Sequence, residues 1–229
     1  MSDKIKIWVI EVGEPVPLPG TNVRLMRTGQ YTEHLANRGV DVTWWASDFY
    51  HGEKRRYDLS KFKAEDGVIR LANGLPARFL HGRPYARNIG LSRILHNIEE
   101  AHDFADKASA LEQPDAIICG YPTIDLAYAA TQYARRRGIP IIIDVRDLWP
   151  DVFLDVSPLP RWVTRSLALP MFLRGAAALR AATGLASITP AILGWGLRKA
   201  GRPLGPNDHV SVLAYMPPTL TAASIEAGE

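Results

Sequence analysis

The chain has 229 residues, of which 47% are hydrophobic and 22% are charged, and its formal net charge is +3. This balance fits one globular domain with a substantial core, and the mild positive charge, without a dense basic stripe, argues against nucleic-acid binding. The single cysteine, Cys119, excludes an intramolecular disulfide and favours a cytoplasmic protein.

The N-terminal part of the sequence predicts a strand, a helix and a second strand. Residues 4–10 carry the β-branched and aromatic side chains typical of a strand, and the lysines within this run argue against a signal peptide. A loop rich in proline and glycine over 11–22 precedes a helix from about residue 23, which Gly39 is expected to end. Over residues 40–46 an apolar side chain recurs at every second position (Val40, Val42, Trp44 and Ala46), which predicts a second strand. We therefore expect a parallel βαβ unit.

The rest of the chain alternates between strand-like and helix-like segments. Two interpretations of the charged, aromatic segment 47–66 stay open: a solvated loop, or a flap that covers the site and contacts an acceptor. The alternation predicts a Rossmann-like, doubly wound, mostly parallel α/β sheet with helices on both faces. Strands are predicted at 67–72, 115–119, the start of 141–151, 184–188 and 209–214, and helices at about 86–111, after Pro122, across 160–183 with a break at Pro170, and from Pro190.

The segment 141–151, IIIDVRDLWPD, carries a clear functional signal. Its apolar start predicts a strand buried on both faces, and aspartate, arginine and tryptophan side chains follow at once. In open parallel sheets, ligands bind outside the carboxyl ends of the strands. The strand exits at 11–22, 121–123, 144–151 and Thr189 are therefore expected to meet at one edge of the sheet and to form the site.

The loop after the first strand lacks the GxGxxG spacing that binds a dinucleotide, and the P-loop, HExxH and GxSxG patterns are absent from the sequence. A nicotinamide or flavin enzyme is therefore disfavoured. His96 and His102 are expected to be helix-surface or packed residues and not ligands, so no metal site is predicted. Gly20, Thr21 and Asn22 precede the predicted helix and offer N–H groups to a phosphate, with Arg24 or Arg27 nearby, although helix capping by Thr21 or Asn22 is a compatible alternative.

Two motifs resemble a known family. The segments DVRDLWPD (144–151) and IWVIEVGEPVPLPGTNVRLMRTGQYTEHLANRGVDVTWWASDF (7–49) resemble the N-terminal domain of family 4 glycosyltransferases, in particular the branch that builds bacterial surface polysaccharides. The resemblance implies the acceptor-binding N-terminal half of a GT-B fold. It also implies a hexosyltransferase that retains configuration without metal or cofactor. The co-substrate would be a nucleotide-sugar, whose phosphate helps to deprotonate the acceptor.

The resemblance implies a division of the chain. Residues 1–216 would form the acceptor-binding domain, and residues 217–229 would begin a linker to a donor domain that this chain lacks. The donor domain's motif of two spaced glutamates is not found, so we expect an excised N-terminal domain that is inactive alone. Two alternatives remain: a non-catalytic acceptor or membrane-recruiting subunit that needs a separate donor-domain chain, and an unrelated nucleotide-binding Rossmann enzyme.

The resemblance also implies roles for residues at the strand exits. Arg146 and Asp147 are the candidate catalytic residues, expected to orient acceptor hydroxyls, whereas an ordinary structural Arg–Asp pair is the alternative. Trp149 or Tyr121 would stack on a sugar face, or else pack against neighbouring side chains. The substrate-binding candidates are Glu14, Gly20, Thr21, Asn22, Arg24, Tyr121, Thr123, Trp149 and Thr189.

Residues 160–182 combine apolar side chains with arginines. An arginine-edged apolar helix can lie in a lipid headgroup layer, although such side chains are more often the core face of packed helices. Because the family often uses lipid-linked acceptors, we hypothesise a cytoplasmic protein that attaches peripherally to the inner face of the membrane. Its expected partners are a sugar or lipid-linked glycan acceptor, a nucleotide-sugar bound by the missing domain, and a membrane surface.

Overall fold

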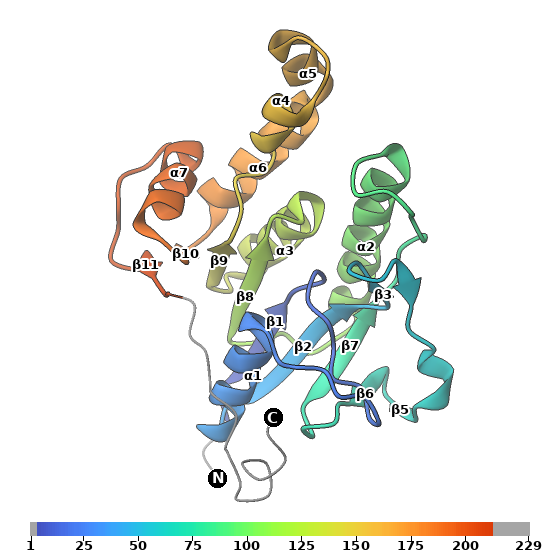
Figure 1. The fold of residues 1–229 in the computed structure, drawn as a ribbon. Coiled ribbons are helices and arrows are strands. Elements are labelled where there is room, and N and C mark those ends of the chain that lie inside the picture. The colour runs from blue at the N-terminus through green and yellow to red at the C-terminus, as the bar shows by residue number, and fades with distance from the viewer. Residues whose placement is uncertain (1–3, 213–229) are drawn as a thin grey trace, which may run out of the picture.

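A nine-stranded sheet forms the centre of the structure, a computed structural model that describes residues 4–212 (Figure 1). The strand order is β11-β10-β9-β8-β1-β2-β7-β6-β5; neighbours from β11 to β7 pair in parallel, and β6 and β5 add an antiparallel edge. The predicted mostly parallel sheet is confirmed. Its strands are β1 (Lys6–Ile10), β2 (Asp41–Ser47), β5 (Ala64–Glu65), β6 (Val68–Arg70), β7 (Pro76–Leu80), β8 (Ala116–Tyr121), β9 (Ile141–Val145), β10 (Gly184–Ser187) and β11 (His209–Val210).

Helices cover both faces of this sheet, as predicted. On one face α2, α3, α6 and α7 pack side by side in that order, whereas α1 lies over β2 on the other face (Figure 1). The two short helices α4 and α5 lie beyond the carboxyl end of β9, next to the start of α6 (Figure 1). The helices are α1 (Arg27–Asn37), α2 (Leu91–Ser109), α3 (Ile124–Arg137), α4 (Val152–Val156), α5 (Arg161–Leu167), α6 (Leu169–Ala181) and α7 (Pro190–Ala200).

Several helix ends follow the predicted residue chemistry. Gly138 ends α3 with φ +68°, in the left-handed region that favours glycine. Pro170 lies in the first turn of α6 and separates it from α5, as the sequence predicts. Thr189 caps α7, because its side-chain oxygen accepts a hydrogen bond from the backbone N–H of Ile192 at 3.3 Å.

Two hydrophobic clusters hold the layers together. The larger cluster packs the sheet against α2, α3, α6 and α7, and within it Trp8 stacks on Tyr133 with ring centroids 5.6 Å apart. The smaller cluster packs Val16 and Leu18 of the loop after β1 against Trp44 on the other face. Burial of these side chains fixes the first half of that loop beside the carboxyl ends of the strands.

The segment 47–66 is not an unanchored solvated loop. It contains the antiparallel hairpin β3 (Phe49–Tyr50) and β4 (Arg55–Arg56) and a single 3₁₀ turn, η1 (Leu59–Lys61). Phe49 and Tyr57 are buried, and Tyr57 belongs to the smaller hydrophobic cluster. The hairpin is therefore held at a defined place beside the loop after β1.

Some element boundaries differ from the sequence-based prediction. Helix α1 begins at Arg27, not near residue 23, because the backbone at Met26 is still extended. β7 and α4 occupy segments for which no element was predicted. Residues 213–229 lie outside the described part of the chain, and with them the end of the strand predicted at 209–214 and the linker predicted at 217–229.

Candidate functional site

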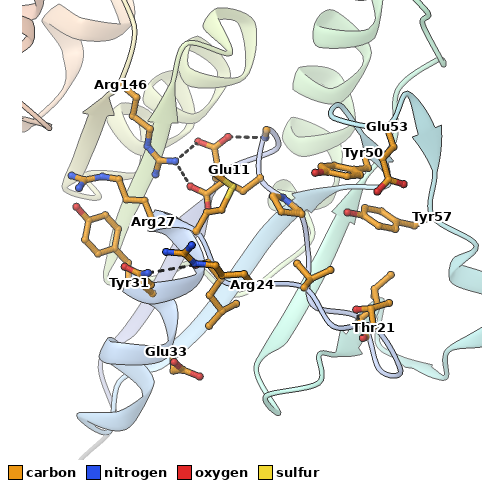
Figure 2. A pocket seen from close by; sticks show the side chains of 18 of the residues that line it. Glu11, Thr21, Arg24, Arg27, Tyr31, Glu33, Tyr50, Glu53, Tyr57 and Arg146 are labelled. Atoms are coloured by element: carbon orange, nitrogen blue, oxygen red, sulfur yellow. Dashed lines mark hydrogen bonds and ion pairs between the residues drawn. The ribbon is translucent and has the colours of Figure 1, made fainter. Parts of the chain in front are cut away.

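A cleft with a volume of about 1530 Å³ opens at the carboxyl end of the central strands. The loop after β1, helix α1, the β3–β4 hairpin and the end of β9 form its walls (Figure 2). In Figure 2, Arg146, Arg27 and Tyr31 lie on one side of the cleft, and Tyr50, Glu53 and Tyr57 lie on the other. The site therefore forms at the sheet edge that the parallel topology predicts.

A buried ion-pair network closes one end of the cleft. Arg27 donates to both carboxylate oxygens of Asp144, from Nε at 2.8 Å and from Nη2 at 3.1 Å. Arg146 donates from Nε to Oδ2 of the same carboxylate at 2.8 Å. Arg27 and Asp144 have side chains only 6% and 1% exposed, so this pair joins α1 to β9 without competition from solvent.

Glu14 occupies the start of α1. Both of its carboxylate oxygens accept the backbone N–H of Thr28, at 3.0 and 2.9 Å, and the Thr28 hydroxyl donates to one of them at 2.9 Å. Arg146 also donates to Glu14 from Nη1, and to the Thr28 hydroxyl from Nη2 at 2.8 Å. A negative charge is stabilised at a helix N-terminus, so the anion at this helix start is the protein's own carboxylate.

Glu11 lies between two glycines at the end of β1. Its Oε1 accepts the backbone N–H of Gly13 at 2.7 Å, and its Oε2 lies 3.4 Å from Nη1 of Arg146. A Cβ at Gly120 would lie 1.8 Å from Oε2, so only glycine leaves room for this carboxylate. Burial raises the pKa of Glu11, Arg146 opposes that rise, and the nearby charge of Glu14 adds to it.

Three carboxylates and two guanidinium groups meet in this network. Burial lowers the pKa of Arg146, but the surrounding carboxylates of Glu11, Asp144 and Glu14 outweigh it, and the net shift is upward. Arg146 therefore stays charged. With every group ionised, the carboxylates of Glu11, Glu14 and Asp144 carry one more charge than Arg27 and Arg146 balance.

The network also holds the last described residues of the chain. Arg27 donates from Nη1 to the backbone carbonyl of Ser211 at 2.8 Å, and the hydroxyls of Tyr31 and Ser211 are 3.0 Å apart. Burial raises the pKa of Tyr31, and its hydrogen bond with Ser211 opposes that shift. Ser211 and Val212 consequently form part of the cleft wall beside α1.

The hairpin supplies an aromatic wall. The rings of Tyr50 and Tyr57 are nearly parallel, with centroids 6.1 Å apart and an interplanar angle of 17°. The Arg55 guanidinium lies 5.6 Å from the centre of the Tyr57 ring and pairs with Glu53. Ring faces beside paired charges offer both apolar and hydrogen-bonding contacts to a polar ring such as a sugar.

Four of the sequence-predicted residues line the cleft: Glu14, Thr21, Arg24 and Arg146. Gly20 and Asn22 are exposed and lie outside the residues that line it. Asp147 accepts a hydrogen bond from the backbone N–H of Leu148 at 2.7 Å and does not line the cleft. Arg146 therefore turns into the site, whereas its neighbour in sequence serves a local turn.

The other four predicted residues lie away from the cleft wall. Tyr121 is fully buried and its hydroxyl donates to the backbone carbonyl of Trp149 at 2.7 Å. The Trp149 ring packs edge-on against Phe153 at 4.2 Å and, with Arg93 beside it, lines a separate small pocket. Thr123 directly precedes α3 without a side-chain cap bond, and Thr189 caps α7.

From the sequence, Thr28 and Tyr31 received no role, Glu11 was included only within the strand exit at 11–22, and Arg27 was only a cation near a possible phosphate. Their burial is the decisive property, because Glu11, Arg27 and Thr28 are no more than 8% exposed. The sequence did contain one indication of these buried charges. Glu11 and Asp144 stand at the ends of apolar, strand-like runs, where a buried charged side chain needs a partner of opposite charge. Within residues 4–212, no group of three or more His, Cys, Asp or Glu side chains is arranged to hold a metal ion.

The architecture defines the chain as a GT-B-type Rossmann-like domain. It superposes on a sucrose-phosphate synthase from Thermosynechococcus elongatus with a TM-score of 0.51 at 13% identity, over 97% of this chain and 95% of that one. It superposes on Arabidopsis thaliana UGT89C1 complexed with UDP with a TM-score of 0.51 at 15% identity. That match covers 99% of this chain and 56% of the plant enzyme, so the chain spans little more than half its length.

Residues 26–213 match the model of the Glycosyl transferase 4-like domain, and the chain belongs to this family. The comparison with curated protein sequences found no match. At these identities the structural likeness establishes the fold alone, and the family match establishes the kind of domain.

Proposed function

We propose that this chain is the acceptor-binding half of a retaining glycosyltransferase. The enzyme would transfer a hexose from a nucleotide-sugar to a glycan or lipid-linked acceptor in bacterial surface-polysaccharide synthesis. The observation that carries the proposal is the cleft at the strand ends, where Glu11, Glu14 and Arg146 face an aromatic wall. Carboxylates bind sugar hydroxyls as hydrogen-bond acceptors, and the guanidinium fixes their orientation.

The nucleotide-sugar is expected to bind a second domain that faces this cleft. In support, UGT89C1 is described as complexed with UDP, and this chain corresponds to 56% of that enzyme. The cleft carries a net acidic cluster beside Arg146, which suits sugar hydroxyls better than a diphosphate. We expect no metal and no cofactor beyond the nucleotide-sugar.

The hairpin is proposed to act as the flap over the acceptor. Tyr50, Glu53 and Tyr57 line the side of the cleft opposite Arg146 (Figure 2). An acceptor that spans the cleft would contact the charged network with its reacting end and the tyrosines with a preceding sugar. Arg24 and Thr21 also line the cleft, Arg24 on the side of Tyr31 and Thr21 on the side of Tyr57 (Figure 2), and are proposed to bind acceptor hydroxyls.

A peripheral membrane position at the cytoplasmic face is also proposed. The tip formed by α5 and the first half of α6 exposes Trp162 (74%), Leu167 (71%) and Leu173 (62%). Among residues 4–212, no helix is long and apolar enough to cross a bilayer. Insertion of these side chains into a headgroup layer would bring the cleft to a lipid-linked acceptor.

Vesicle flotation tests the membrane position. The wild-type chain should float with anionic phosphatidylglycerol vesicles, and binding should fall with salt and fall further in Trp162→Ala plus Leu167→Ala. A matched control is Leu204→Ala, because Leu204 is 66% exposed but belongs to another surface. Equal recovery of all three proteins in the unbound fraction would reject membrane attachment.

A non-catalytic acceptor or membrane-recruiting subunit is the second candidate, and the exposed apolar tip is the observation that favours it. Both candidates bind an acceptor, but only the enzyme transfers sugar once a donor domain is joined to it. We therefore propose two parallel assays of nucleotide release, with UDP-glucose, GDP-mannose and dTDP-rhamnose as donors and acceptor lipids extracted from bacterial membranes. Residues 1–229 alone should release no nucleotide.

The chain joined to a family donor domain should release nucleotide from one donor and form a product that keeps the anomeric configuration. Arg146→Ala in the joined protein should lower turnover by about 100-fold or more, because the acceptor loses its orienting cation. Turnover by residues 1–229 alone would contradict the half-site proposal. Absence of transfer by every joined protein would favour the non-catalytic subunit.

A further inference from the structure

Glu11 differs from the other two carboxylates of the network in how weakly its charge is compensated. Asp144 accepts three guanidinium N–H groups from Arg27 and Arg146. Glu14 accepts the N–H and hydroxyl of Thr28 and one N–H of Arg146. Glu11 accepts a single backbone N–H from Gly13, and the nearest cation atom is 3.4 Å away. The geometry therefore leaves Glu11 with the least compensated charge of the three carboxylates.

The backbone places this carboxylate with little freedom. The Glu11 N–H donates to the carbonyl of Trp45 at 2.9 Å, and the Glu11 carbonyl accepts the indole N–H of Trp44 at 3.3 Å. Its side chain is only 9% exposed, and the exposed part faces the cleft, of which it forms a wall. Gly13 and Gly120 flank the carboxylate on two sides, so it has access to a ligand from the cleft alone.

The groups that face Glu11 come from every neighbouring element. Glu14 belongs to the same loop, and Asp144 and Arg146 come from the end of β9, whereas Arg27 of α1 pairs with Asp144. On β8 the only titratable neighbour is the buried thiol of Cys119, whose pKa is raised by burial, so it stays protonated. Burial has the largest effect on the pKa of Glu11 and raises it, Arg146 lowers it, and the charges of Glu14 and Asp144 raise it.

We propose that Glu11 takes the proton of the acceptor hydroxyl during sugar transfer. This inference rests on the proposed function and changes one part of it, because the family resemblance assigns that proton to the donor phosphate. The acceptor oxygen forms a bond to C1 of the sugar while the bond between C1 and the phosphate oxygen breaks. The bonding electron pair leaves with the nucleotide phosphate, and the hydroxyl proton moves to Oε2 of Glu11 and later to solvent.

The chemistry suits a glutamate in this position. A general base works best when its pKa lies near the working pH, and the burial that raises the pKa of Glu11 moves it in that direction. Asp144 and Glu14 instead serve to position Arg146, which donates to both carboxylates. Glu11 is thus the carboxylate of the three that both lines the cleft and has a weakly compensated charge.

The first test follows protonation directly in residues 1–229. The chain is labelled with glutamate carrying ¹³C at the side-chain carboxyl, and the signals are titrated by NMR from pH 4 to pH 9. The signal missing in Glu11→Gln should titrate above the ordinary glutamate value of 4.5, and Glu14→Gln should lower its pKa by removing a like charge. Titration of that signal at or below the ordinary value would overturn the proposal, whatever the fate of the proposed function.

The second test measures transfer by the chain joined to a donor domain, with the donor that the wild type turns over. Glu11→Gln should lower kcat by about 100-fold or more and abolish the acid limb of the pH–rate profile, with acceptor KM unchanged. Glu11→Asp should restore part of the rate. A Glu11→Gln enzyme with wild-type kcat and pH profile would overturn the inference, whereas an inactive wild type would instead contradict the proposed function.

Discussion

Arg27 and Asp144 form a two-bond ion pair that connects the first turn of α1 to the end of β9, across 117 positions of sequence. The pair closes the cleft from behind and aligns Arg146, which shares the same carboxylate oxygen. Because both side chains are almost fully buried, neither charge has solvent to replace its partner. The pair therefore couples the fold of the N-terminal βαβ unit to the geometry of the site.

Arg27→Ala should destabilise the protein by about 3–5 kcal/mol, because it leaves the Asp144 carboxylate buried with two of its three guanidinium hydrogen bonds removed. Urea unfolding followed by circular dichroism measures this change. Arg161→Ala is the matched control, since Arg161 pairs with Asp155 at the surface, and its effect should lie within about 0.5 kcal/mol. Equal effects of the two substitutions would contradict the role of the buried pair.

Gly120→Ala should displace the Glu11 carboxylate, because the new methyl group would fall 1.8 Å from its Oε2. We expect a loss of stability of about 1–3 kcal/mol and a change in the Glu11 titration. In contrast, Gly90→Ala should be well tolerated, since a Cβ there would meet no atom within 4 Å. Thermal unfolding measures the stability of both variants, and carboxyl NMR measures the Glu11 titration. An unperturbed Glu11 signal in Gly120→Ala would contradict the close contact between Gly120 and the Glu11 carboxylate.

Tyr50→Ala should weaken binding of an oligosaccharide acceptor by roughly tenfold, equivalent to about 1.4 kcal/mol, because the aromatic wall loses its outer ring. Tyr128→Ala is the control, because Tyr128 is half-buried against the larger hydrophobic cluster on α3, away from the cleft. Isothermal titration with an oligosaccharide found to bind the wild type gives both affinities. If the two substitutions weaken binding equally, the hairpin does not form part of the acceptor site.

His51 should make stability fall as the pH is lowered. Burial, with the nearby charges of Arg93 and Lys54, lowers the pKa of His51 to about 4, below its ordinary value of 6.5. Between these two pKa values, His51 is protonated in the unfolded chain but neutral in the folded chain. The free energy of unfolding therefore declines as the pH falls from about 6.5 towards 4. His51→Gln should reduce this slope in urea unfolding at several pH values, and an unchanged slope would show that His51 does not contribute.

The sequence was sufficient to predict the sheet, since the apolar runs of β1, β8 and β9 have the continuous hydrophobicity of strands buried on both faces. It also placed Glu14, Thr21, Arg24 and Arg146 in loops that do line the cleft. These successes share one cause: parallel topology brings every strand exit to the same edge. Local pattern and topology together determine which loops meet.

The direction of individual side chains could not be predicted in this way. Asp147 and Arg146 are adjacent, but only Arg146 turns into the network, because Asp144 and Glu14 offer it buried partners 2 and 132 positions away. Tyr121 follows a strand exit as expected, yet its ring fills the core and its hydroxyl is bound to Trp149. Glu11 was included in the strand exit at 11–22 but received no role of its own, because its position depends on Gly120, which is remote in sequence.

Binding of saccharides to the cleft tests the central claim most directly. Fluorescently labelled residues 1–229 are applied to a glycan array that carries bacterial surface oligosaccharides, beside spots of immobilised UDP as a nucleotide control. We predict binding to at least one oligosaccharide and none to UDP, with loss of the saccharide signal in Arg146→Ala and in Tyr50→Ala while the circular dichroism spectrum is preserved. Binding to UDP but to no saccharide, or saccharide binding that survives both substitutions, would contradict the assignment of this cleft as an acceptor site.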